Sequence, residues 1–213
     1  MTILNSWMVW VEYIGVIAFA ISGAMTAQEK NMDFFGAASL GMVTATGGGV
    51  IRDILLGITP PSMFRNPTYA IIAIISAIIV ELTPIRRALA KRHSLRDMLV
   101  LICDTAGLGV FAVMGVRTAI GAFPDSNVFV LLFTGTLTGC GGGILRDMLA
   151  GQTPAIFSKR IYAIACIAGA LVCALLWRYS SPLAMASGAV LVWVLRGLAV
   201  CFHWNLPTVG DNG

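Results

Sequence analysis

Long apolar runs separated by short polar groups follow one another along almost the whole chain. A helix rises about 1.5 Å per residue, so about 20 apolar residues are needed to cross about 30 Å of hydrocarbon. The pattern therefore predicts an all-α integral membrane protein with seven transmembrane helices in a single domain, residues 1–213. The expected spans are residues 7–27, 33–56, 67–82, 97–116, 126–150, 161–179 and 182–203.

One motif occurs twice. The second span contains GGGVIRD at residues 47–53, and the fifth contains GGGILRD at residues 141–147, 94 positions later. Each copy lies in the middle of a unit of three spans, and three crossings reverse the direction of the chain. The sequence therefore predicts two inverted three-helix repeats, residues 7–84 and 97–179, with a seventh helix at 182–203 outside the symmetry.

Basic residues gather in the connections between the spans. The loop at residues 85–96 carries five of them, which is typical of a cytoplasmic loop, where anionic lipid headgroups are the natural partner. With the N-terminus outside, the inner connections and flanks hold eight Lys or Arg against three on the outside. We therefore expect a multi-pass protein of the cell inner membrane with its N-terminus outside and its C-terminus in the cytoplasm.

Composition agrees with a membrane protein and excludes several function classes. Hydrophobic residues make up 58% of the chain, charged residues only 11%, and the mean hydropathy is +0.87, which leaves too few charges to cover a soluble surface. The net charge of +4 lies in connections rather than on one face, so no nucleic acid is expected. Phosphate-binding and metalloprotease motifs are absent. We expect no enzymatic activity, no cofactor and no metal beyond a transient monovalent cation.

The glycine triplets allow two interpretations. Glycine inside a helix costs about 1 kcal/mol relative to alanine, so three in succession indicate a purpose. They either let a neighbouring helix approach closely or let the helix break and turn backbone groups into a cavity. Thr44 and Thr138 precede the triplets, and their hydroxyls could serve freed backbone groups or a dehydrating cation.

Charged residues inside the spans are the other candidates. Neighbouring residues on a helix do not face one another, so we expect the motif arginine and aspartate not to pair simply and each of them to reach another element. The candidate partners are Asp104, Arg196 and the charges of the other motif. The motif charges then either form a fixed ionic latch or line an aqueous path. Asp104 is a candidate for the ion path, because a lone carboxylate within a span is costly without a cation or an arginine nearby. The candidates for gating or structural ion pairs are Arg52, Asp53, Arg146, Asp147 and Arg196.

Several segments together resemble the prokaryotic branch of the trimeric intracellular cation (TRIC) channel family. They are FAISGA at residues 19–24, TATGGGVIRD at 44–53, DTAGL at 104–108 and the second motif at 139–147. The resemblance implies a homotrimer with a potassium-permeable pore in each protomer, bounded by second and fifth helices that are broken at the triplets. The implied pore positions are Gly47, Gly48, Gly49, Gly141, Gly142 and Gly143.

The resemblance also implies an alternative function. Some bacterial relatives are described as glycine transporters, which would make this chain a secondary carrier for a small amino acid such as glycine. A channel needs a path that can be open to both sides at once, whereas a carrier needs a closed site that alternates between the two sides. A structural or scaffold role without transport is the third alternative.

Overall fold

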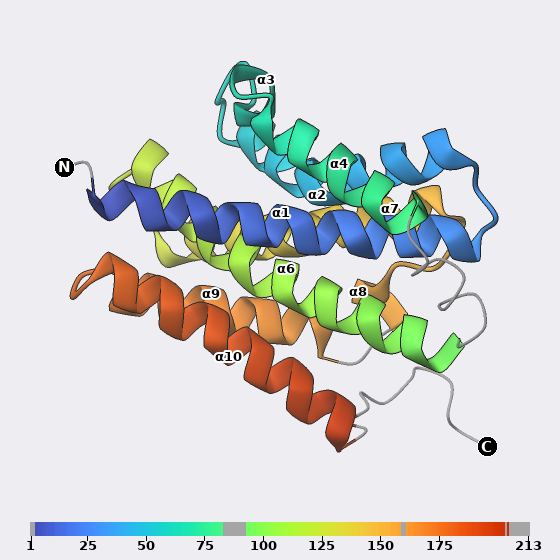
Figure 1. Cartoon of the computed structure of the whole chain (residues 1–213). Helices are drawn as coiled ribbons and strands as arrows, with labels where there is room; N and C mark the ends of the chain where they lie inside the picture. The colour runs from blue at the N-terminus through green and yellow to red at the C-terminus, as the bar shows by residue number, and fades with distance from the viewer. Residues whose placement is uncertain (1–2, 83–92, 159–160, 203, 205–213) are drawn as a thin grey trace.

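The computed structural model describes residues 3–82, 93–158, 161–202 and 204, and every regular element in these residues is a helix. The long helices lie side by side in a bundle, with α1 and α6 running in opposite directions (Figure 1). The helices are α1 Ile3–Glu29, α2 Phe34–Leu55, α3 Ser62–Arg65, α4 Thr68–Leu82, α6 His93–Ala122, α7 Val128–Leu149, α8 Ala155–Ser158, α9 Tyr162–Leu176 and α10 Ser181–Cys201.

Five helices are long and apolar enough to cross a membrane, namely α1, α2, α6, α7 and α10. The chain is therefore a multi-pass integral membrane protein. Two further apolar helices, α4 and α9, have 15 residues each within the described part of the chain, which corresponds to about 22 Å. The count of seven spans stays a prediction, because it depends on these two shorter helices.

The observed helix ends lie close to the expected ones, with one large difference. Helix α6 runs from His93 to Ala122 instead of from residue 97 to residue 116. Arg117, which was expected in a connection, is therefore inside a helix, where its side chain faces Glu12 of α1. The end of the predicted basic loop also belongs to α6, while residues 85–92 lie outside the described residues.

The two motif helices end in the same way. Gly57 after α2 and Gly151 after α7 both have a φ of +67°, a left-handed conformation that glycine adopts without steric cost. The amide after each glycine donates to the carbonyl of the motif aspartate, Ile58 to Asp53 and Gln152 to Asp147, both at 2.8 Å. These bonds are the Schellman ending expected where a glycine follows a helix. The short helices α3 and α8 then follow, and the sequence pattern did not predict them.

The expected breaks at the glycine triplets are not seen. Helix α2 continues through residues 47–49 and α7 through residues 141–143. A methyl group on Gly48 would lie 2.3 Å from the carbonyl oxygen of Thr138, and one on Gly142 would lie 2.1 Å from that of Thr44. The triplets therefore let the backbones of α2 and α7 touch, which is the packing interpretation.

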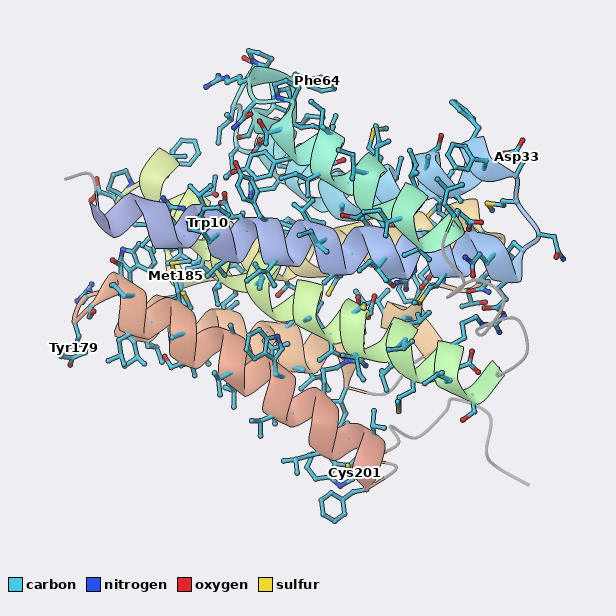
Figure 2. The ribbon with its side chains drawn as sticks, in the orientation of Figure 1. Trp10, Asp33, Phe64, Tyr179, Met185 and Cys201 are labelled. Carbon is cyan, nitrogen blue, oxygen red and sulfur yellow. The ribbon has the colours of Figure 1, made fainter. Side chains whose placement is uncertain are left out.

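Matching contacts recur in the two halves of the bundle. A methyl group on Gly23 of α1 would lie 2.6 Å from Oγ1 of Thr44, and one on Gly115 of α6 would lie 2.6 Å from Oγ1 of Thr138. Helix α1 packs on α2 and α4, as α6 packs on α7 and α9. Trp10 and Asp33 lie toward opposite ends of α1 (Figure 2). Helix α6 runs beside α1 in the opposite direction. Helix α10, which packs on α6 and α9, has no counterpart among the described helices.

We predict that Gly142→Ala destabilises the protein. Its new methyl group would overlap the Thr44 carbonyl oxygen at 2.1 Å, and overpacking of this kind costs about 1–3 kcal/mol. The thermal unfolding midpoint in detergent should fall. The matched control is Gly197→Ala, where no atom of the described residues lies within 4 Å of the added methyl group and alanine favours the helix. Equal midpoints for the two variants would contradict close backbone packing at the triplets.

Candidate functional site

Two cavities that contain charged side chains enter the bundle from opposite ends. The first, of about 160 Å³, is lined by Glu12 in the first half of α1 and by Thr118 near the end of α6. The second, of about 260 Å³, is lined by Thr26 near the end of α1 and by Asp104 in the first half of α6. Because α1 and α6 run in opposite directions (Figure 1), these linings place the cavities at opposite ends. We call them the Glu12 cavity and the Asp104 cavity.

The first motif fixes the chain that follows α2. Nε of Arg52 donates to Oδ1 of Asp53 at 2.8 Å, and the other carboxylate oxygen, Oδ2, accepts from the backbone amide of Ser62 at 2.7 Å. Ser62 is the first residue of α3. Since an ionised acceptor makes a hydrogen bond stronger, Asp53 holds the start of α3 against the end of α2.

The second motif repeats this arrangement at the other end of the bundle. Nε of Arg146 donates to Oδ1 of Asp147 at 2.9 Å, and Oδ2 of Asp147 accepts from the amide of Ala155, the first residue of α8, at 2.8 Å. The expectation that the adjacent arginine and aspartate do not pair was therefore wrong, whereas the expectation that a motif arginine reaches Asp104 is confirmed for Arg146. The guanidinium is long enough to fold back onto the next residue in the last turn of the helix.

Arg146 also reaches two other helices. Its Nη1 donates to Oδ1 of Asp104 on α6 at 2.7 Å and to the hydroxyl of Ser22 on α1 at 2.6 Å. Arg196 of α10 approaches the same carboxylate from the other side, with Nη2 at 3.7 Å from Oδ2 of Asp104. Its guanidinium lies over the ring of Tyr162, 4.7 Å from the ring centre. The lone carboxylate of the fourth span thus has two arginine partners.

The Glu12 cavity is built differently. The hydroxyl of Tyr69 donates to the carboxylate of Glu12, and Nη1 of Arg117 lies 3.7 Å from Oε1 of Glu12. Among the described residues, no hydrogen bond joins Arg52 to Glu12. Residues of α6 correspond to residues of α1 at an offset of 92 positions, so Met114 is the counterpart of Ser22. Met114 lines this cavity and offers no hydroxyl to Arg52. The two motif arginines therefore differ in how many helices they connect.

A second repeat in the sequence relates α1 to α6, and our predictions missed it. Glu12 was not predicted as a site residue, yet it is the counterpart of Asp104. The first and fourth spans carry acidic, Gly, Phe-Ala, Gly and Thr-Ala positions at identical spacing, and aligning these two spans would have identified Glu12. The matched residues are Glu12, Gly15, Phe19, Ala20, Gly23, Thr26 and Ala27 with Asp104, Gly107, Phe111, Ala112, Gly115, Thr118 and Ala119.

A packed barrier separates the two cavities. Along α1, Val16 lines the Glu12 cavity and Thr26 lines the Asp104 cavity, a separation of about 15 Å at the helical rise. Phe19 lies between them, only 1% exposed, and its ring stacks on that of Phe111 with 5.3 Å between the ring centres. Packed side chains therefore separate the two cavities at the level of the glycine crossing, where Phe19 lies beside Gly142.

The predicted site residues divide among these three regions. Thr44 and Thr138 lie in the barrier, where their hydroxyls donate to backbone carbonyls one turn earlier, each at 2.6 Å. Their hydroxyl hydrogens are therefore already used within their own helices. Gly47, Gly48, Gly141 and Gly142 lie at the crossing, whereas Gly143 faces Tyr162 and Asp104. Gly49, Arg52 and Asp53 line the Glu12 cavity, and Asp104, Arg146, Asp147 and Arg196 line the Asp104 cavity.

Sequence comparisons connect the chain with bacterial membrane proteins. A family model described as glycine transporter matches residues 9–84 and 101–178. The inner membrane protein YadS of Escherichia coli is 37% identical over 96% of this chain and 98% of its own length. The membrane protein YvgT of Bacillus subtilis is 39% identical over 94% of this chain and 96% of its own length.

Structural comparisons show that the helix bundle is similar to solved cation channels. A TRIC cation channel structure is 32% identical and superimposes with a TM-score of 0.79 over 95% of this chain and 97% of that one. The TRIC channel orthologue from Rhodobacter sphaeroides is 29% identical, with a TM-score of 0.84 over 94% of this chain and 100% of that one. The bundle described above therefore has the fold of these channels.

We predict that the two motif arginines contribute unequally to stability. Arg146 is 4% exposed and bonds Asp104, Asp147 and Ser22, whereas Arg52 is 11% exposed and bonds Asp53. Removing one partner of a buried ion pair costs about 3–5 kcal/mol.

Arg146→Gln should therefore lower the thermal unfolding midpoint clearly more than Arg52→Gln, its counterpart in the repeat. The comparison uses purified protein in one detergent and at one pH. A larger loss for Arg52→Gln, or equal losses for the two variants, would show that the bonds to α1 and α6 do not stabilise the fold.

Proposed function

The chain belongs to the membrane transport family described as glycine transporter, and from this premise we propose that it conducts potassium or a similar monovalent cation. The TRIC fold supports this proposal, because the similar structures are cation channels. The pore would lie within each protomer and run from the Glu12 cavity to the Asp104 cavity.

The observation that carries the proposal is that a single barrier separates two polar cavities. Each cavity contains a carboxylate at a matching depth, Glu12 at one end and Asp104 at the other. Glu29 and Asp97 add further carboxylates to the Asp104 cavity, which favours entry of cations. If the barrier opened, the two cavities would join into a continuous path, as a channel requires.

The aromatic pair at the barrier provides the gate in this proposal. Phe19 and Phe111 come from matching positions in α1 and α6, and their rings stack where the two cavities approach each other. If the two rings moved apart, the glycine backbones of α2 and α7 would be the narrowest part of the path. The motif ion pairs would then hold the helix ends in place while the middle moves.

We also propose an oligomeric state and a membrane location for the protein. A homotrimer is supported by the trimeric channels that share the fold, and an inner-membrane location by the relative in Escherichia coli. With the N-terminus outside, the Glu12 cavity opens to the exterior and the Asp104 cavity to the cytoplasm. The basic loop would contact anionic lipid headgroups on the cytoplasmic side.

A carrier for a small amino acid is the second candidate function. The family description supports it, and so does the architecture, because two cavities that approach one closed barrier from opposite ends also suit alternating access. Each cavity contains charges of both signs, such as Glu12 with Arg52, as a zwitterionic substrate requires. A scaffold role without transport would leave the polar cavities without a purpose.

A direct measurement distinguishes the channel from the carrier. Purified protein in planar bilayers should give unitary currents, and in a potassium chloride gradient the reversal potential should lie near that of potassium. Proteoliposomes from the same preparation should show no saturable uptake of labelled glycine. If currents are absent while saturable uptake is present, the carrier is correct, and if neither occurs, transport by this chain is refuted.

We predict that Phe19→Ala increases the mean cation current. The substitution removes one ring of the buried stack that closes the path, so the closed state loses more packing energy than the open state. The control is Phe129→Ala, which removes a ring that is 72% exposed on α7. The control should leave the current unchanged, and an unchanged current for Phe19→Ala as well would remove this residue from the gate.

A further inference from the structure

Tyr69 and Tyr162 occupy equivalent places in the two repeats. Tyr69 is the second residue of α4 and Tyr162 the first residue of α9. They stand 93 positions apart, and each begins the tripeptide Tyr-Ala-Ile. The same spacing separates Ser62 from Ala155, whose amides bind the two motif aspartates. Each half of the bundle therefore contains a carboxylate, a motif arginine and a tyrosine at matching positions.

In the first half, the tyrosine binds the carboxylate. The hydroxyl of Tyr69 donates to Glu12. Arg52 lines the same cavity as these two residues, but its Nε donates to Asp53. Among the described residues, no hydrogen bond joins Arg52 to Glu12, so the motif arginine is not the donor here.

In the second half, the motif arginine binds the carboxylate. Nη1 of Arg146 donates to Oδ1 of Asp104 at 2.7 Å. The hydroxyl of Tyr162 lies 3.5 Å from the same oxygen, which is longer than an ordinary O–H···O hydrogen bond. The two halves thus show opposite choices between the same two kinds of donor.

A second arginine accompanies each carboxylate and is not part of this choice. Nη1 of Arg117 lies 3.7 Å from Oε1 of Glu12, and Nη2 of Arg196 lies 3.7 Å from Oδ2 of Asp104. A carboxylate within a membrane span is costly without a cation nearby, and each one keeps such a cation whichever donor binds it. The motif arginines likewise keep their bonds to the adjacent aspartates. The donor can therefore change without leaving a buried charge unpaired.

Helices α1 and α6 connect the two carboxylates with the barrier between the cavities. Phe111 lies seven residues, about two turns, after Asp104 on α6, and Phe19 lies seven residues after Glu12 on α1. Shortening the 3.5 Å separation between Tyr162 and Asp104 to an ordinary hydrogen bond requires a shift of about 1 Å. Helix shifts of about 1–2 Å are common in conformational switches. A shift of α6 that changes the donor of Asp104 therefore also moves one ring of the stack.

We propose that each carboxylate exchanges its donor when the barrier opens. In the open state Tyr162 binds Asp104 in place of Arg146, and in the first repeat the carboxylate passes from the tyrosine to the motif arginine. This exchange rests on the proposed function and adds the residues that control the barrier. The closed arrangement is favoured because Ser22 gives Arg146 a further acceptor at 2.6 Å, whereas the matching position on α6 is Met114.

The test is a matched pair of tyrosine substitutions, measured as mean cation current in planar bilayers. Tyr162→Phe keeps the ring that lies under Arg196 and removes a hydroxyl that binds Asp104 only in the open state. The current should fall about fivefold, which is the effect of one hydrogen bond, and the thermal unfolding midpoint should not fall. Tyr69→Phe removes a bond of the closed state, so the current should rise by a similar factor.

The control is Tyr179→Phe, which removes a hydroxyl from a side chain that is 83% exposed. It should leave both the current and the midpoint unchanged. Opposite changes in current distinguish a switch from a structural role, because a loss of packing would change both variants in the same direction. Currents that change in the same direction in Tyr69→Phe and Tyr162→Phe, or in neither, would overturn the exchange.

A second readout does not depend on conduction. Ala45 is 4% exposed, lines the Glu12 cavity and packs in one cluster with Phe19. A cysteine at this position, in protein without the five native cysteines, should react with a small thiol reagent faster in Tyr69→Phe and more slowly in Tyr162→Phe. If the unaltered protein carries no current, the proposed conduction fails and this rate decides. Equal rates in the two variants would contradict the donor exchange.

Discussion

The contact between the backbones of α2 and α7 is the constraint on which the rest of the structure depends. At this crossing a single methyl group on Gly48 or Gly142 would overlap a carbonyl oxygen of the other helix. Helices without a hydrophobic driving force in lipid associate through such close packing. The crossing places the two Arg-Asp motifs toward opposite ends of the bundle, and each motif then fixes the short helix that follows it.

The charged groups are arranged around this crossing, and their energetics explain why the two ends differ. A buried ion pair stabilises a protein only if its groups find good partners, and Arg146 finds them on α1, α6 and its own helix. Arg196 is held more loosely, because its Nη2 lies 3.7 Å from Oδ2 of Asp104 and its Nε has no hydrogen-bond partner among the described residues. Helix α10 therefore adds a buried charge that the described residues satisfy poorly, and this charge lies in only one of the two related cavities.

Sequence patterns predicted the apolar helices, their order and most of their ends, because hydrophobic length and the Gly and Pro after each motif act locally. They did not distinguish packing from a break at Gly48 and Gly142, because glycine permits both and only the neighbouring helix decides. The pairing of each motif arginine with its own aspartate depends on the short helices α3 and α8, whose amides take the second carboxylate oxygen. Glu12 was missed because the repeat that identifies it consists of single residues and dipeptides at matched spacing in α1 and α6, which no continuous motif marks.

Conduction through the protomer requires that the glycine crossing separates two cavities that open to opposite sides of the membrane. Cysteine accessibility tests this claim, in a variant without the five native cysteines. Thr46 lines the Glu12 cavity and Thr26 the Asp104 cavity, so cysteines at these positions should react with a membrane-impermeant thiol reagent from opposite sides only. Reaction of both positions from the same side would contradict the account.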